Sequence, residues 1–448
     1  MTGFGSPFAP GRRTSHAGGG LPRQDVRMAR GDEALEPVEL IRQSGAVLRV
    51  GKAMLSSGTG SYRVKSAMQQ VARAFGLDRH EAHVTLTEIT TTSHSGSIFR
   101  TEVAEVRTVA VDAHRLAELT DLTNALRPGA TVDEVNREVD RIEAIPPLHG
   151  PLANALFAAM ACGAFAFLNN GGVVEVVGAF LGAGAGQALR RYFLHRRFNQ
   201  FAVTMMAAAV ACLVYLGFVT ALEVWAGETA ASHQAGFISA VLFLVPGFAL
   251  VTAALDLAKM DFSAGVARSV YALISLTSAG LSVWAVAWAT GMSSDPLAAP
   301  ALPLWAIVLL RAVASFLGVL GFALMFNSTW RMAFAAAAIG MVANVLRLQV
   351  ADAGAAMQAA TVLATLVVGL LAAVVAPRLR IPRITVSVPA VVIMVPGAAV
   401  YRTLVGLNNG DVEAAVQSGV QGVFVTICIA IGLAGARILT DRAWAYER

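Results

Sequence analysis

Hydrophobic and polar positions divide the chain near residue 148 into two parts with different patterns. Before that point, apolar residues recur at helical spacing in short segments such as 38–58 and 61–77. The segment "HVTLTEITTT" (83–92) instead alternates and is rich in β-branched residues, which predicts a strand, and "SIFRTEVAEVRTVAV" (97–111) is its candidate partner. The pattern therefore predicts a small soluble α+β domain over residues 38–148.

Two further helices complete this domain, at 112–126 and 131–145. Thr131 precedes the second of them with a glutamate three residues on, a capping-box pattern that satisfies amides of the first helical turn. The prolines at 146–147 then end the domain. Residues 1–37 are rich in Gly, Pro and Arg and contain no apolar signal-peptide core, so we expect a disordered cytoplasmic tail.

From residue 152 onward, the apolar runs are long enough to cross a bilayer, which requires about 20 helical residues. Composition agrees, because the chain is 56% hydrophobic and only 14% charged, whereas soluble domains carry about 25% charged residues. The expected fold class is a multi-span α-helical membrane protein with about ten transmembrane helices. The ten runs are 152–168, 171–189, 201–222, 235–255, 267–290, 303–326, 330–348, 354–376, 385–404 and 414–438.

Charge placement orients these spans. Residues 1–150 hold 18 basic and 18 acidic side chains, so the whole net charge of +5 lies in the apolar part. With the soluble domain in the cytoplasm, 13 of the 16 later basic residues fall in internal segments, as the positive-inside tendency requires. Arg347 and Arg402 fall on the outer side, and Arg311 lies within a span. We therefore expect a multi-pass protein of the cytoplasmic membrane with both termini in the cytoplasm, and no nucleic-acid partner.

A Val-Pro-Gly motif occurs twice within the apolar runs. It stands in "FLVPGFALVTAALDLAKMDF" (243–262) and in "IMVPGAAVYRTLVGLNNGDV" (393–412), with the prolines 150 positions apart (396 − 246). In both copies an aspartate follows the proline by 15 positions. Asn169 and Asn327, which stand in short turns, are 158 positions apart (327 − 169). These spacings predict that the membrane part is a duplicated unit.

The duplication has a topological consequence. The two copies would be five-span repeats at 149–292 and 300–440, followed by a cytoplasmic tail at 441–448. Because five is odd, two sequential copies cross the bilayer in opposite directions. Such a 5+5 inverted repeat is common in secondary transporters, where one repeat rocks against the other around a central site.

The duplicated prolines indicate where that site lies. Proline removes a helical hydrogen bond, and the freed backbone groups persist in a membrane only where they face protein, water or ligand. Two breaks meeting near the midplane would offer carbonyls to an ammonium group and helix N-termini to a carboxylate, the two charged groups of an amino acid. The alternative is a packing kink at each proline. The predicted substrate-binding residues are Val245, Pro246, Gly247, Val395, Pro396 and Gly397, with Asn169 and Asn327 as pocket-lining residues or simple turn formers.

Charged residues within or beside the spans are candidates for proton coupling or gating, because intramembrane charge is costly. The aspartates that trail the two motifs would lie at opposite rims, as gates or as hydrated loop residues. A buried arginine needs an anion or carbonyl groups as partners. The candidates for coupling or gating are Asp256, Asp261, Asp411 and Glu175, with Lys259 and Arg311 as charge partners.

Together these segments resemble the threonine/serine exporter family. The likeness lies in "AVLRVGKAMLSSGTGSYRVKSAMQQVARAFGL" (46–77), in "VTLTEITTT" (84–92) and in both Val-Pro-Gly segments with their aspartates, and it covers about residues 38–440. It implies a cytoplasmic domain fused to ten spans, and export of threonine and serine driven by the proton-motive force. Related two-polypeptide systems are connected with succinate export, which makes a small dicarboxylate the rival substrate.

Catalytic and metal-binding patterns are missing from the sequence. The histidines of "DRHEAH", His80 and His83, are three apart, whereas a zinc helix needs His-Glu-x-x-His; a metal site with His94 is the minor alternative. The three cysteines lie far apart in apolar runs as small core residues. We therefore expect a transporter with no cofactor or metal, not an enzyme, although a membrane-anchored enzyme using the soluble domain is a rival of another class. The expected partners are a small-molecule substrate, protons and the lipid bilayer; a homo-oligomer is compatible with the sequence.

Overall fold

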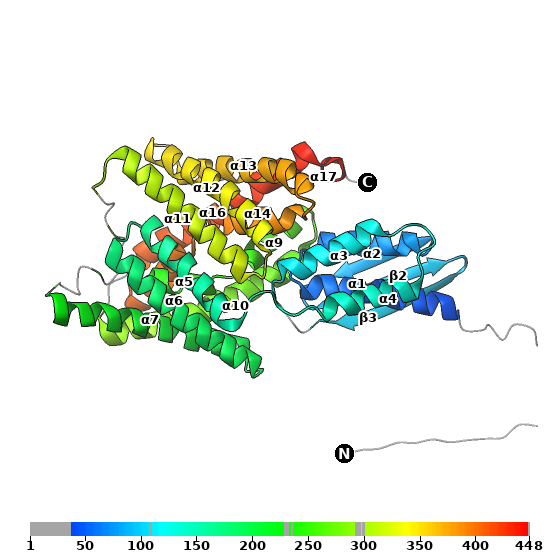
Figure 1. The fold of residues 1–448 in the computed structure, drawn as a ribbon, viewed down its shortest axis with the longest axis horizontal. Coiled ribbons are helices and arrows are strands. Elements are labelled where there is room, and N and C mark those ends of the chain that lie inside the picture. The colour runs from blue at the N-terminus through cyan, green and yellow to red at the C-terminus, as the bar shows by residue number, and fades with distance from the viewer. Residues whose placement is uncertain are drawn as a thin grey trace, which may run out of the picture. The chain divides into compact units, whose positions relative to one another are not determined.

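The computed structural model describes residues 37–106, 110–227, 233, 236–291, 297 and 301–446. Residues 39–448 form one compact unit, to which the elements below belong, with α1 beginning one residue earlier. Most of the described residues are helical, and the strands are confined to the part ahead of residue 148 (Figure 1).

Four helices and three strands make up this first part. The strands form one antiparallel sheet in the order β1-β2-β3, and β2 buries Ile89, Thr91 and Ser93 on one face. α2 buries Val64 and Met68, four residues apart on one helical face, in the same core. The elements are α1 (Val38–Ser56), α2 (Ser61–Ala74), β1 (Arg79–Val84), β2 (Glu88–Ser95), β3 (Ile98–Glu105), α3 (Ala113–Ala125) and α4 (Val132–Glu143).

The segment 83–92, expected as one strand, is divided between two. β1 ends before Thr85, whose side chain accepts hydrogen bonds from the amides of Thr87 at 3.4 Å and Glu88 at 3.1 Å. This threonine turn reverses the chain without interrupting the alternating pattern of the sequence, so periodicity alone did not reveal it. The expected partner at 97–111 supplies β3.

Side-chain caps begin the last two helices of this part. Asp112 accepts a hydrogen bond from the amide of Arg115 at 2.9 Å, and Thr131 accepts one from the amide of Glu134 at 3.3 Å. Each cap satisfies an amide that has no partner within its own helix. The predicted cap at Thr131 is therefore confirmed.

The helices after residue 150 are those of a multi-span membrane protein. Within the described residues, seven helices are long and apolar enough to cross a membrane, or eight if α14 and α15, bent by 45°, form one span. Ten were expected; α6 carries Gln187 and Arg190 among its apolar residues, and the segment from α8 to α9 is divided into short pieces. The helices are α5 (Pro151–Leu168), α6 (Val173–His195), α7 (Gln200–Ala226), α8 (Phe237–Ala240), the 3-10 helix η2 (Leu242–Leu244), α9 (Gly247–Ala258), α10 (Phe262–Thr290), α11 (Leu304–Met325), α12 (Trp330–Asp352), α13 (Met357–Arg378), α14 (Arg383–Val392), α15 (Gly397–Asn409), α16 (Val412–Thr440) and α17 (Arg442–Ala445).

Helix lengths and contacts recur along this part. α6 and α12 each have 23 residues and begin 157 positions apart (330 − 173), and the same shift separates α7 from α13 (357 − 200). α10 and α16 each have 29 residues and begin 150 positions apart (412 − 262). α5 packs on α6 as α11 packs on α12, and α10 contacts α15 as α16 contacts α9.

The turns after α5 and α11 correct one spacing inferred from the sequence. Asn170 (φ 68°) and Asn327 (φ 59°) are both left-handed, a conformation that asparagine tolerates better than most residues. The next amides close the two turns on the carbonyls of Ala166 and Ala323. Asn327 therefore corresponds to Asn170, 157 positions earlier, rather than to Asn169.

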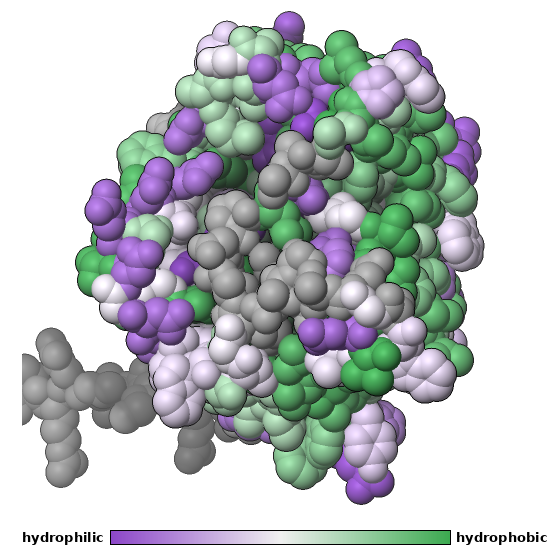
Figure 2. Space-filling model, turned by 90° about the vertical axis from the view of Figure 1, so that its left-hand side faces the viewer, coloured by the Kyte–Doolittle hydropathy of each residue, from purple (hydrophilic) through white to green (hydrophobic). Residues whose placement is uncertain are grey.

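Small residues let the helices of the bundle approach backbone to backbone. A Cβ atom on Gly182 would lie 2.6 Å from the carbonyl oxygen of Ala211, and one on Gly321 would lie 2.6 Å from that of Phe157. Close packing of this kind associates helices in lipid, where apolar burial between helices gives no driving force. α10 and α16 leave many large apolar side chains exposed, and Figure 2 shows continuous areas of hydrophobic residues on the face that it draws.

Candidate functional site

Both Val-Pro-Gly motifs interrupt helices in the same way. Pro246 (φ −77°, ψ 56°) and Pro396 (φ −79°, ψ 54°) have nearly identical conformations. In each motif the glycine amide donates to the valine carbonyl two residues earlier, at 2.7 Å and 2.8 Å. The helix then resumes at Gly247 as α9 and at Gly397 as α15, with the proline carbonyl as an early acceptor. The chain is therefore broken where the motifs predict.

The two breaks pack against each other. A Cβ atom on Gly397 would lie 2.7 Å from Cγ2 of Val245 and 2.9 Å from Cδ2 of Leu242. A Cβ atom on Gly247 would lie 3.2 Å from Cγ1 of Val392. Each glycine thus leaves room for apolar side chains of the other break, and α9 contacts α14 while α15 contacts α8. Segments 150 residues apart in sequence therefore meet in the buried core.

A guanidinium group reaches the second break. Arg347 donates through Nη1 to the carbonyl of Met394 at 3.4 Å and through Nε to Oδ1 of Asn344 at 3.1 Å. Arg190 stands 157 positions earlier (347 − 190), in α6. Sequence reasoning counted both arginines only as charges on one or other side of the membrane. Their shared spacing with the recurring helices is the signal that could have singled them out.

Asp256 connects the helix after the first break to α2, and we call this contact region of α2, α9 and α10 the joint. This aspartate, 2% exposed near the end of α9, lies 3.1 Å from Nε of Arg268 in an ion pair and accepts the amide hydrogen bond of Ser61 at 3.3 Å. Arg268 also donates to the carbonyl of Thr59 at 2.7 Å. The N-cap residue of α2 is Gly60, which has no side chain to cap the helix, so Asp256 supplies the negative acceptor instead. A Cβ atom on Gly60 would lie 2.9 Å from Oδ1 of Asp256.

The other two charged residues after the first break, Asp261 and Lys259, also contact α2 at this joint. Asp261 accepts from the Ser61 hydroxyl and forms an ion pair with Nζ of Lys65 at 2.6 Å. Lys259 lies over the rings of Tyr62 and Trp444, 5.4 Å and 4.6 Å from their centroids. The predicted charge partner Lys259 therefore contacts aromatic rings of α2 and the C-terminal segment.

Glu175, Asn169 and Asp411 lie elsewhere. Glu175, 3% exposed, accepts the amide hydrogen bond of Gly172 at 2.7 Å, and its other oxygen lies 2.6 Å from Nδ1 of His233. Asn169 donates to the hydroxyl of Ser239 at 3.3 Å, just ahead of the first break. Asp411 caps α16 from an exposed position. Sequence reasoning missed the histidine, because 58 residues separate it from its glutamate.

Asn327 and Arg311 bind other residues of the protein, outside the two breaks. Asn327 donates to Oδ1 of Asp112 at 2.9 Å and accepts the amide hydrogen bond of Leu148 at 2.8 Å, so it connects the α11–α12 turn to the part of the chain ahead of α5. Arg311 of α11 forms an ion pair with Asp352 of α12. The structure therefore brings together the two breaks, and brings the three charged residues after the first break to α2.

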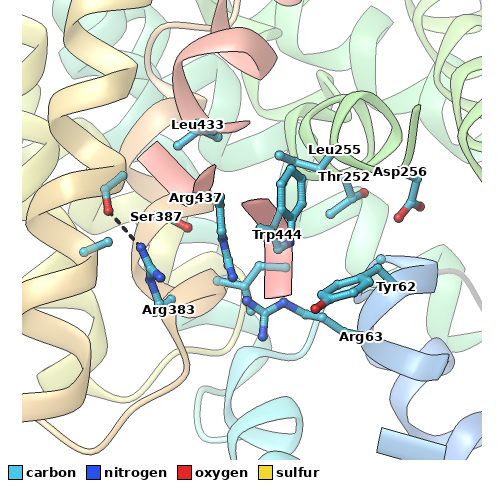
Figure 3. A pocket seen from close by; sticks show the side chains of 14 residues that line it. Tyr62, Arg63, Thr252, Leu255, Asp256, Arg383, Ser387, Leu433, Arg437 and Trp444 are labelled. Atoms are coloured by element: carbon cyan, nitrogen blue, oxygen red, sulfur yellow. Dashed lines mark hydrogen bonds between the residues drawn. The ribbon is translucent and has the colours of Figure 1, made fainter. Parts of the chain in front are cut away.

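A small cavity lies beside this joint, with walls from α2, α9, α13, α14, α16 and α17 (Figure 3). Its volume is about 40 Å³, room for a few water molecules. The hydroxyls of Thr252 and Ser387 line it, as do the rings of Tyr62 and Trp444, which meet edge to face at 6.2 Å. Figure 3 shows Trp444 beside Arg437 and Tyr62.

Three arginines give this cavity a positive character. Arg63 comes from α2, Arg383 from the start of α14 and Arg437 from the last turns of α16. Burial, partly offset by Tyr62, lowers the pKa of Arg63 to about 10, and the charge of Arg383 adds to this lowering. Arg383 donates to the carbonyl of Gly369 at 3.3 Å. The three residues are far apart in sequence, where they count only as positive charges of the inner side.

Family models match both halves of the chain. Residues 46–290 match the family described as "Putative threonine/serine exporter", and residues 311–438 match the one described as "Threonine/Serine exporter, ThrE". No solved structure matches the chain. The family assignment therefore rests on sequence matches both to the α+β part ahead of residue 148 and to the long apolar helices that follow it.

Three relatives extend this result. The "Threonine/serine exporter" of Corynebacterium glutamicum is 24% identical over 92% of this chain and 86% of its own length. The "Probable threonine/serine exporter" of Mycobacterium tuberculosis is 28% identical over 81% of this chain and 70% of its own. The "Probable succinate transporter subunit YjjP" of Escherichia coli is 24% identical over 53% of this chain and 93% of its own. Since one family model alone matches more than half of the chain, the protein belongs to the threonine/serine exporter family.

Proposed function

We propose that this protein exports L-threonine and L-serine across the cytoplasmic membrane by secondary active transport. The observation that carries this proposal is the match to exporters named for these two amino acids, which extends over the soluble domain and the membrane helices together. The relatives are named as exporters or transporter subunits, and buried helix breaks are also found at the substrate sites of secondary transporters. Both termini would lie in the cytoplasm.

The membrane part would be a 5+5 inverted repeat, with α5–α10 as one copy and α11–α16 as the other. The recurrence of helix lengths at shifts of 157 and 150 residues supports this arrangement. So does the exchange of contacts, in which α10 meets α15 and α16 meets α9. The change of shift by seven residues falls in the connection between the third helix of each copy and its broken helix.

Alternating access would turn on the paired breaks. In the structure the apolar residues of the breaks close the core, so a rocking motion of one copy against the other would part them and expose their backbone groups. Breaks of this kind can hold both ends of an amino acid, because α9 and α15 begin there and carbonyls end the preceding segments. Val245, Pro246, Gly247, Val395, Pro396 and Gly397 would contact the substrate, with Arg347 beside Met394.

Acidic residues would couple transport to protons. Asp256 and Asp261 contact α2, which would place them at the inner end of the first copy, and Glu175 lies buried against His233 at the start of α6. Protonation of any of these carboxylates would loosen a contact that holds helices together. Asp411, at the matching position in the second copy, would gate the outer rim.

A small dicarboxylate is the second candidate substrate. It is favoured by the relative named as a succinate transporter subunit and by the three arginines around the cavity. That relative matches about half of this chain, whereas the threonine/serine exporters match most of it. Amino-acid export is therefore the function that we put forward.

Counterflow with the purified protein in proteoliposomes tests the substrate. We expect vesicles loaded with unlabelled threonine to accumulate labelled threonine, and external serine to compete with the label. External succinate should not replace threonine as the exchanged solute, because it lacks the ammonium group that the carbonyls of the paired breaks would hold. Counterflow of labelled succinate without counterflow of threonine would contradict the proposal. A protonophore should slow net efflux but spare counterflow if protons are coupled.

A further inference from the structure

We propose that the arginine-lined cavity binds the carboxylate of the exported amino acid as a cytoplasmic loading site, ahead of the paired breaks. The inference rests on the proposed function, since it concerns the same substrate. The walls of the cavity come from the soluble domain and from helices of both halves of the membrane part. A ligand held there would touch α2, one helix of the first membrane half and several helices of the second.

The cavity holds more positive charge than its own acids neutralise. Arg63, Arg383 and Arg437 lie close enough to repel one another. Asp441 acts electrostatically on all three, and its carboxylate lies 3.9 Å from Nη1 of Arg437. Asp256, also in the wall, is already held in an ion pair. Three guanidinium groups around one shared carboxylate attract a second anion, and the planar fork of arginine matches a carboxylate with two parallel hydrogen bonds.

An unused hydrogen-bond donor points to the same ligand. Nε1 of Trp444 is buried, and no described residue accepts its hydrogen. An indole N–H can only donate, so it suits an acceptor such as a carboxylate oxygen. The buried hydroxyl of Ser387 also lines the cavity, where it can bond the side-chain hydroxyl of threonine or serine. The combination of cationic groups, a free donor and a hydroxyl fits a small hydroxylated carboxylate.

The size of the cavity indicates how loading proceeds. About 40 Å³ holds a few water molecules, so a whole amino acid enters only when a wall moves outward. We place the wall that moves at the short helix α17, which is four residues long. Lys259 holds it through the Trp444 carbonyl, at 3.5 Å, and through the ring. Displacement of α17 would open the arginines to the cytoplasm.

A thermodynamic cycle tests whether the arginines of the cavity bind the carboxylate, because it compares two ligands and two forms of the protein. Binding of threonine and of threoninol, which lacks the carboxylate, is measured by calorimetry on the full-length protein and on Arg437→Gln. We expect the variant to bind threonine about tenfold or more weakly and threoninol as weakly as the unchanged protein does. Arg378→Gln is the matched control, because Arg378 lies at the end of α13 but donates to its own helix at Val374.

The outcomes separate the inference from the function on which it rests. Equal losses for threonine and threoninol, or an unchanged affinity for threonine, would overturn the carboxylate site while threonine counterflow stayed intact. Failure of the unchanged protein to bind or exchange threonine would overturn the export function with it. Should Arg437→Gln fail to fold, as judged by its thermal unfolding, Arg63→Gln in the soluble domain takes its place in the cycle.

Discussion

Replacing Arg268 with methionine is expected to lower the free energy of unfolding by about 3–5 kcal/mol and to abolish threonine export from proteoliposomes. The substitution leaves the carboxylate of Asp256 buried at 2% exposure with no ion-pair partner. It also removes the hydrogen bond to the Thr59 carbonyl, which helps to hold the segment just ahead of α2. Thermal unfolding in detergent and counterflow in vesicles measure the two effects.

The matched variants are Asp256→Asn and the double variant that carries both changes. Removing one charge of a buried pair costs more than removing both, because the remaining charge is no longer compensated. We therefore expect the double variant to be more stable than Arg268→Met alone. A double variant whose loss equals the sum of the two single losses would show that the pair does not interact, and would remove the basis for a joint at this position.

Replacing Gly397 with valine is expected to reduce threonine export at least about tenfold while the protein still inserts into the membrane. The added Cβ atom would lie 2.7 Å from Cγ2 of Val245, so the two breaks must separate or distort. Overpacking of a core typically costs about 1–3 kcal/mol. Efflux of labelled threonine and the amount of protein in purified membranes are the measurements.

Two further glycines provide a graded series for this effect. A Cβ atom on Gly247 would lie 3.2 Å from Val392, a contact that a small shift relieves, whereas nothing lies within 4 Å of one on Gly217 in α7. Export should therefore fall most for Gly397→Val, less for Gly247→Val and least for Gly217→Val. An equal loss in all three would attribute the effect to valine in a helix rather than to the packing of the breaks.

Much of the fold follows from local patterns in the sequence. The helices of the soluble domain, the cap at Thr131 and the interruptions at Pro246 and Pro396 all depend on residues within one turn of each other, so the sequence exposes them directly. The turn at Thr85 could not be recognised in the sequence, because threonine is common both in strands and in turns. Asn170 rather than Asn169 matches Asn327, since the left-handed residue of a turn is set by backbone geometry.

The joint and the cavity could not be predicted in the same way. Ser61 and Asp261 are 200 residues apart, and nothing in either segment indicates that they meet. The glycine at position 60 looks like an ordinary loop residue until Asp256 is seen to occupy the space of its missing side chain. Nothing in the sequence around Arg63 or Arg437 distinguishes them from ordinary surface arginines, and only the fold shows that they line one cavity.

Labelling of single cysteines from the two sides of the membrane tests the inverted repeat most directly. Phe262 and Val412 begin α10 and α16, stand 150 positions apart (412 − 262), and are 55% and 58% exposed. Each is replaced by cysteine in a protein whose buried cysteines, Cys162, Cys212 and Cys428, are alanine. We expect an impermeant thiol reagent to label position 262 only from the cytoplasmic side and position 412 only from outside. Labelling of both positions from the same side would contradict the inverted arrangement and, with it, the proposed mechanism.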